Sequence, residues 1–102
     1  MRKVINHKLY DTETADYLGS TQEFSPRNFR HFEEDLYRTG KGQFFLAGKG
    51  GGLSKYRQPT GDGMWCGGSD IFLLSESEAK DWVEQYLSVS DYESIFGSVE
   101  EG

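Results

Sequence analysis

A helical repeat near the C-terminus is the feature that most limits what this chain can fold into. Apolar residues recur there at i, i+3, i+4, i+7 and i+8, while charged side chains occupy the other faces, which is the pattern of an amphipathic helix. Ser75 and Glu78 have the spacing of a capping box, so we predict a helix over about 76–87 that covers an apolar surface. The repeating residues are Ala79, Trp82, Val83, Tyr86 and Leu87.

Shorter patterns predict the elements around this helix. Residues 39–42 are a turn signal, and the run 43–47 is apolar and rich in β formers, so we predict a hairpin with arms at about 32–38 and 43–48. Further strands are expected at 71–74 and in short apolar segments of the first 21 residues. A second capping box, Ser90 with Glu93, predicts a short terminal helix that Gly97 ends.

Together these elements predict an α+β fold, in which a small antiparallel β-sheet carries the amphipathic helix and the short terminal helix on one face. With 102 residues, the chain is expected to form a single domain over 1–102. A Gly-rich, polar stretch at about 48–69 predicts a long loop, and long loops are usually functional or mobile. We expect one buried core that contains Trp82, Val83, Tyr86 and Leu87 with Ile71, Leu73 and one face of residues 44–46.

Charge is unevenly distributed along the chain. From Asp70 onward there are nine acidic residues against Lys80 alone, whereas the preceding residues hold eight acidic and ten basic ones. The acidic C-terminal part suits a basic partner. Three adjacent acids in the first arm of the hairpin are either a solvated strand edge or part of the same contact surface. The candidate acidic contact residues are Glu33, Glu34, Asp35, Asp81 and Glu84.

The middle of the chain is basic and carries a candidate nucleic-acid contact. Lys55 and Arg57 flank Tyr56, and cations beside an aromatic ring suit phosphate contact and base stacking. Lys49 lies in the preceding glycine cluster and could add a further phosphate contact. The alternative for Tyr56 is that its ring packs on the core while the two cations are solvated.

Catalytic and metal-binding patterns are weak. His7, His31 and Cys66 are the only imidazole and thiol groups, and no spacing among them preorganises a zinc site. Cys66, next to Trp65, is expected to be a buried thiol. The glycine cluster lacks the spacing of a phosphate-binding loop, so no cofactor is expected. A metal-independent ribonuclease that uses the two histidines as acid and base stays open as an alternative to a non-enzymatic protein.

The single cysteine excludes an intrachain disulfide, and the basic start of the chain lacks the apolar run of a signal peptide. No stretch approaches membrane-spanning length. We therefore expect a cytoplasmic protein without a membrane partner.

Several segments together resemble a family. They are DTETA at 11–15, LYRTGKGQFFL at 36–46, GGLSKY at 51–56, LSESEAKDW at 74–82 and YESIFG at 92–97. They are similar to small proteins carried by phages and other mobile elements of Gram-positive bacteria, some of which are type II-A anti-CRISPR proteins. The resemblance covers most of the chain.

This resemblance implies an inhibitor that binds Cas9 in the cytoplasm of a bacterial host cell. It would interfere either with the assembly of Cas9 and guide RNA or with the loading of target DNA. The partner would be Cas9, the Cas9–guide RNA complex or the guide RNA itself. The alternative is a non-catalytic protein of a mobile element that binds another RNA or a regulator.

Overall fold

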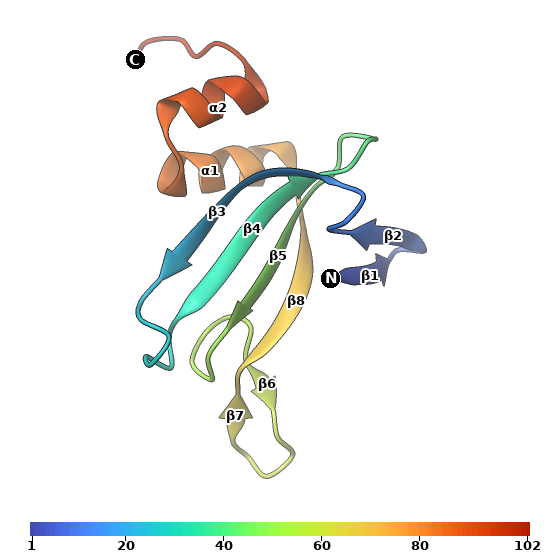
Figure 1. Ribbon diagram of the computed structural model, residues 1–102, viewed down its shortest axis with the longest axis vertical. Helices are drawn as coiled ribbons and strands as arrows, with labels where there is room; N and C mark the ends of the chain where they lie inside the picture. The colour runs from blue at the N-terminus through green and yellow to red at the C-terminus, as the bar shows by residue number, and fades with distance from the viewer.

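A four-stranded antiparallel sheet forms the centre of the molecule in a computed structural model that describes residues 1–102 (Figure 1). Its strand order is β3-β4-β5-β8, so consecutive strands are neighbours except where β6 and β7 intervene. The fold is α+β, as the sequence predicts. The sheet strands are β3 (Asp16–Glu23), β4 (Phe32–Arg38), β5 (Phe44–Gly50) and β8 (Gly68–Leu74).

The predicted hairpin is β4 and β5, which pair along their whole length from Phe32 opposite Gly50 to Arg38 opposite Phe44. Residues 39–42 close it, with a backbone hydrogen bond from Gly42 to Thr39. Gly42 has a φ of 90°, a conformation that side chains with a Cβ rarely adopt. The turn chemistry therefore fixes the register on which the whole sheet is built.

Helices α1 (Glu76–Tyr86) and α2 (Val89–Phe96) pack against one face of the sheet at one end of its strands, and we call this the helix face (Figure 1). Its buried core consists of Leu36, Phe44, Leu46, Ala79, Trp82 and Val83. The predicted capping box of Ser75 and Glu78 is present. Tyr86 and Leu87, by contrast, are only half-buried at the margin of this core.

The terminal helix begins before its predicted start. Ser88 and Asp91 form its capping box, rather than Ser90 and Glu93. The chain leaves α1 with extended backbone at Leu87, so Ser88 is the first residue with a capping side chain that the chain reaches. The predicted end at Gly97 is confirmed.

The opposite face of the sheet carries a second, smaller core, and we call it the hairpin face. The strands β1 (Arg2–Ile5) and β2 (Lys8–Asp11) pair as a separate hairpin, so of the N-terminal segments only β3 joins the main sheet. Tyr10 from β2 packs in this core. Its buried residues are Tyr10, Phe45, Ala47 and Ile71.

The expectation that Ile71 and Leu73 lie beneath α1 is therefore wrong. Side chains alternate along a strand, and the pairing of Leu46 with Phe72 places Ile71 and Leu73 on the hairpin face. The sequence predicts the strand, but both of its faces carry apolar residues, so periodicity alone does not determine which face meets the helix.

The stretch 48–69 is not a single long loop. β5 continues to Gly50, β8 begins at Gly68, and β6 (Gln58–Pro59) pairs with β7 (Trp65–Cys66) in between. A Cβ at Gly48 would overlap the Tyr56 ring, and one at Gly50 would overlap Ser54. These glycines therefore serve close packing of the segment against the sheet rather than flexibility. Neither α1 nor α2 is long and apolar enough to cross a membrane.

Candidate interaction surfaces

The two helices and the chain end after them carry the densest charge of the molecule. Eight exposed carboxylates lie within residues 76–101, against one cation, Lys80, which pairs with Glu76 at 3.5 Å. We call these carboxylates the acidic helical surface. They belong to Glu76, Glu78, Asp81, Glu84, Asp91, Glu93, Glu100 and Glu101.

Asp81 and Glu84, both predicted contact residues, are exposed three positions apart on α1 and have no ion-pair partner. Glu78 differs from them, because hydrogen bonds with the backbone and hydroxyl of Ser75 lower the pKa of its carboxyl. Glu78 is therefore occupied by capping, whereas Asp81 and Glu84 are free to meet a partner.

An apolar hollow lies beside these charges, between α1, α2 and the chain end. Its volume is about 350 Å³, and Glu84 lies among its lining residues. Val89 is 72% exposed although it starts α2. A hollow with an apolar centre and charged surroundings is typical of protein interfaces. The apolar lining residues are Val83, Leu87, Val89, Tyr92 and Val99.

The three adjacent acids of β4 do not form one surface. β4 lies between β3 and β5, so it is not a strand edge, and its side chains alternate between the two faces. Glu33 and Asp35 are half-buried on the hairpin face, where burial and the charge of Glu33 raise the pKa of Asp35. Glu34 points to the helix face and is fully buried, so it is not a contact residue.

Glu34 is instead the centre of a buried polar network. The Tyr56 hydroxyl donates to its Oε2 at 2.6 Å, and the Trp82 indole N–H donates to its Oε1 at 3.0 Å. The Lys55 ammonium forms an ion pair with Oε2. Burial and the bond to Glu34 raise the pKa of the Tyr56 hydroxyl. The network thus joins β4, α1 and the segment before β6.

Tyr56 is therefore not available for base stacking, and its prediction as a nucleic-acid contact is wrong. Its ring is buried over Gly48, in agreement with the alternative of packing on the core. Lys55 is held by Glu34, and Lys49 pairs with Glu33 at 3.4 Å. Arg57 remains exposed, with its guanidinium 4.7 Å from the centre of the Trp65 ring.

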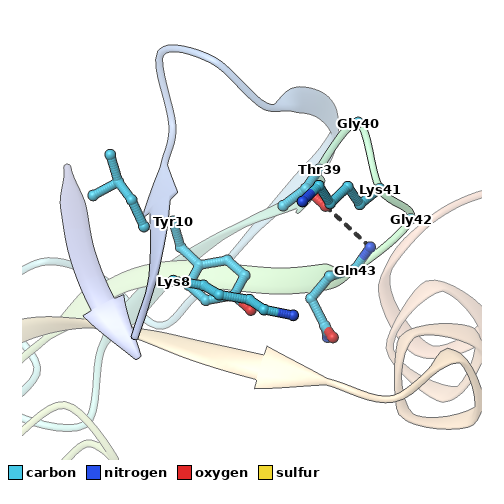
Figure 2. Close-up of a pocket in the computed structure, with 8 residues that line it drawn as sticks. Lys8, Tyr10, Thr39, Gly40, Lys41, Gly42 and Gln43 are labelled. Atoms are coloured by element: carbon cyan, nitrogen blue, oxygen red, sulfur yellow. Dashed lines mark hydrogen bonds between the residues drawn. The ribbon is translucent and has the colours of Figure 1, made fainter. Parts of the chain in front are cut away.

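A further hollow lies between β2 and the β4–β5 turn, with a volume of about 570 Å³ (Figure 2). Lys8 and Tyr10 line one side, and residues 39–43 line the other. The Gln43 side-chain amide is occupied, since it donates to the carbonyls of Phe44 and Leu74. The hollow has two lysines and no carboxylate, so it attracts anions, but both lysines are solvent-exposed and no buried polar group selects a ligand.

The histidines and the thiol are not brought together. His7 lies in the β1–β2 turn and His31 in the β3–β4 loop, two segments that lie far apart in Figure 1. The His31 Nδ1 is 2.8 Å from the Asn28 carbonyl. Cys66 is exposed on β7, so its prediction as a buried thiol is wrong. No group of three or more His, Cys, Asp or Glu side chains has a metal-binding arrangement.

Sequence reasoning missed the exposed residues of the β3–β4 loop. The segment around Pro26 indicates only a break between strands, yet it presents Arg27, Phe29 and Arg30 to solvent. The signal that could have found them is the alternation of cations and rings in FSPRNFRH at 24–31, which resembles the KYR pattern at 55–57. No protein-family model, curated protein or solved structure matches the chain. Its function is therefore inferred from the chemistry of these surfaces.

Proposed function

We propose that this protein is a non-enzymatic anti-CRISPR inhibitor that binds a type II-A Cas9, free or with its guide RNA, in the cytoplasm of a bacterial host cell. The observation that carries the proposal is the acidic helical surface, which has eight exposed carboxylates and a single lysine. Occupation of the Cas9 surface that grips nucleic acid would prevent guide RNA assembly or target DNA loading.

Electrostatics supports a Cas9 partner. Cas9 holds the guide–target heteroduplex in a positively charged channel and reads its backbone and shape rather than its sequence. A rigid helix pair with a high density of carboxylates can compete for such a channel, because opposite charges accelerate encounter and favour the matched orientation. The apolar hollow beside Glu84 adds desolvated contact area, which a purely nucleic-acid-like surface would lack.

The arrangement of side chains also favours binding over catalysis. A general acid and a general base must both reach one reacting group, and His7 and His31 lie in separate segments of the fold. Incubation with guide RNA should therefore leave the RNA intact. Cleavage that is lost in both His7→Ala and His31→Ala would support the ribonuclease alternative instead.

The test is co-purification with a type II-A Cas9, with and without guide RNA, followed by a DNA cleavage assay. Asp81→Lys and Glu84→Lys should each weaken inhibition about tenfold while the melting temperature changes little, because exposed charges contribute little to folding. The matched control is Glu13→Lys, which reverses one exposed carboxylate in the β2–β3 turn. We expect the control to inhibit like the wild type.

Two results would overturn the proposal. One is the absence of a Cas9 complex under both conditions. The other is a biological effect that persists in a host without Cas9, which would favour the alternative of a protein that binds another RNA or a regulator.

A further inference from the structure

Three segments form the end of the molecule opposite the helices, at the bottom of Figure 1. They are the β3–β4 loop (24–31), the segment 51–57 and the β6–β7 hairpin with its flanks (58–67), and we call them together the loop end. Backbone hydrogen bonds join them, from Leu53 to the Phe29 carbonyl at 2.8 Å and from Gly51 to the His31 carbonyl at 3.0 Å. A Cβ on Gly52 would lie 3.1 Å from the Trp65 carbonyl, so the hairpin also lies against them.

The loop end presents large aromatic rings to solvent. Phe29 is 72% exposed, Phe24 is 54% exposed and Trp65 is 52% exposed. None of the three belongs to either core. Trp65 is held in place by the pairing of β6 and β7 and by the Arg57 guanidinium over its face. Large apolar patches on a protein surface mark interaction sites, and three exposed rings within one end of the molecule favour such a site.

The loop end is also basic. Its segments hold four cationic side chains and a single acidic residue, Asp62. The Asp62 carboxylate is occupied by the Thr60 hydroxyl and the Met64 amide. Arg27 and Arg30 are exposed and have no ion-pair partner. The four cations are Arg27, Arg30, Lys55 and Arg57, of which Lys55 is paired with the buried Glu34 and the three arginines remain for a ligand.

We propose that the loop end binds single-stranded nucleic acid. Phe29 and Trp65 would stack on bases, while Arg27, Arg30 and Arg57 contact phosphates. Proteins that bind single strands combine rings that stack on bases with cations that follow the backbone. A duplex hides its base faces in its own stack, so exposed rings favour unpaired bases over a duplex.

The net charge of −6 does not oppose this assignment. The molecule is 50 Å long, and the acidic helices and the loop end lie at the two ends of this axis (Figure 1). At physiological ionic strength the Debye length is about 8 Å, so charges several Debye lengths away are largely screened. A strand near the loop end therefore experiences the local cations rather than the total charge.

The test is fluorescence anisotropy with fluorescein-labelled RNA and DNA single strands of about 16 nucleotides and a duplex of the same sequence. We expect both single strands, or one of them, to bind more tightly than the duplex. A preference for RNA would identify contacts to the 2′-hydroxyl, and equal binding would identify stacking and phosphate contacts alone. No Cas9 is present, so this result is independent of the proposed function.

Three variants assign the binding to the loop end. Trp65→Ala should weaken binding about tenfold, the typical effect of removing one stacking ring. Arg27→Ala/Arg30→Ala should also weaken binding, and should reduce the slope of log K against log salt concentration by about 0.7 for each phosphate that the variant no longer neutralises. The matched control, Arg2→Ala/Lys3→Ala, removes two exposed cations from the N-terminal hairpin and should bind within about twofold of the wild type.

Three outcomes would overturn the proposal. The first is no binding of any probe at about 100 μM protein in low salt, where even non-specific complexes form. The second is equal affinity for the duplex and the single strands. The third is an equal decrease in affinity for the control and for the loop-end variants, all of them folded by circular dichroism.

Discussion

The two ends of this molecule are stabilised by different physical forces. At the helical end, α1 buries Ala79, Trp82 and Val83 against apolar side chains of the sheet. At the loop end, the segment before β6 is held by the carboxylate of Glu34 and by close packing on Gly48 and Gly50. Apolar burial is non-directional and tolerates adjustment, whereas a buried hydrogen-bonded network needs every partner in place.

Because its two ends are stabilised differently, so small a chain can expose two surfaces of different charge. Apart from Glu78 and Asp91, which cap the two helices, the charges of the helical end lie outside its apolar core and can change without loss of the fold. The exposed rings of the loop end and its arginines take no part in the Glu34 network. Trp82 connects the two ends, because its ring belongs to the helix-face core and its N–H binds Glu34.

Trp82→Ala should have the largest effect, since it removes both the apolar packing of the ring and the hydrogen bond from its N–H to Glu34. We expect the free energy of unfolding in urea to fall by about 4 kcal/mol, as for other buried tryptophans. Trp82→Phe keeps most of the apolar packing and removes the N–H donor, so it should cost about 1–3 kcal/mol. An unchanged urea midpoint for Trp82→Ala would mean that α1 does not pack on the sheet.

Glu34→Ala should destabilise the protein by about 3 kcal/mol, because it leaves the buried Tyr56 hydroxyl and the Trp82 N–H without their acceptor. The two ends should respond differently. Hydrogen exchange should accelerate most in residues 51–59, while α1 keeps its apolar packing. Equal acceleration at both ends would show that the ends are not stabilised separately.

Tyr56→Phe tests the loop end alone, since it removes one hydrogen bond and keeps the ring over Gly48. We expect a loss of about 1–1.5 kcal/mol at neutral pH. The pKa of Tyr56 is raised in the folded state, so its contribution is fully present below the unfolded pKa of about 10 and is lost as the pH rises through the folded value. Urea titrations above pH 10 should therefore show a steeper fall in stability for the wild type than for Tyr56→Phe.

Ser88→Ala should have the smallest effect, about 1 kcal/mol, because it removes only the cap of α2. Ser90→Ala is the matched control and should be close to neutral, since Ser90 is exposed within the helix. A larger loss of stability for Ser90→Ala than for Ser88→Ala would instead support the predicted capping box of Ser90 and Glu93. Thermal unfolding followed by circular dichroism measures both variants.

The sequence predicts the elements better than their packing partners. The 3.6-residue repeat of α1 and the turn at 39–42 are local, so the helix and the hairpin are placed within about two residues. The network of Glu34 joins four side chains from three segments that are far apart in the chain. No local pattern indicates that Glu34 is buried while Glu33 and Asp35 are not. The burial of Glu34 follows from the register of β4 with β5, which places it opposite Gly48.

The exposure of the candidate contact residues is likewise predicted well where it follows from a local repeat and poorly where it depends on distant residues. Asp81 and Glu84 are exposed as expected, because a helix with an apolar side must present its other side to solvent. Tyr56 lies between two cations in the sequence, but it is buried because Gly48 leaves room for its ring. Whether a ring in an irregular segment is exposed depends on such distant glycines. The sequence next to the ring does not reveal them.

The acidic helical surface and the loop end are proposed to bind separate partners. The most direct test is to measure how tightly each of three proteins binds each partner. Wild type, Glu84→Lys and Arg27→Ala/Arg30→Ala are each titrated with the form of Cas9, free or guide-loaded, that the wild type binds more tightly, and with the single strand that it binds more tightly. We predict that Glu84→Lys loses affinity for Cas9 alone and that Arg27→Ala/Arg30→Ala loses affinity for the single strand alone, by about tenfold in each case. Loss of both affinities in either folded variant would contradict the separation of the two surfaces.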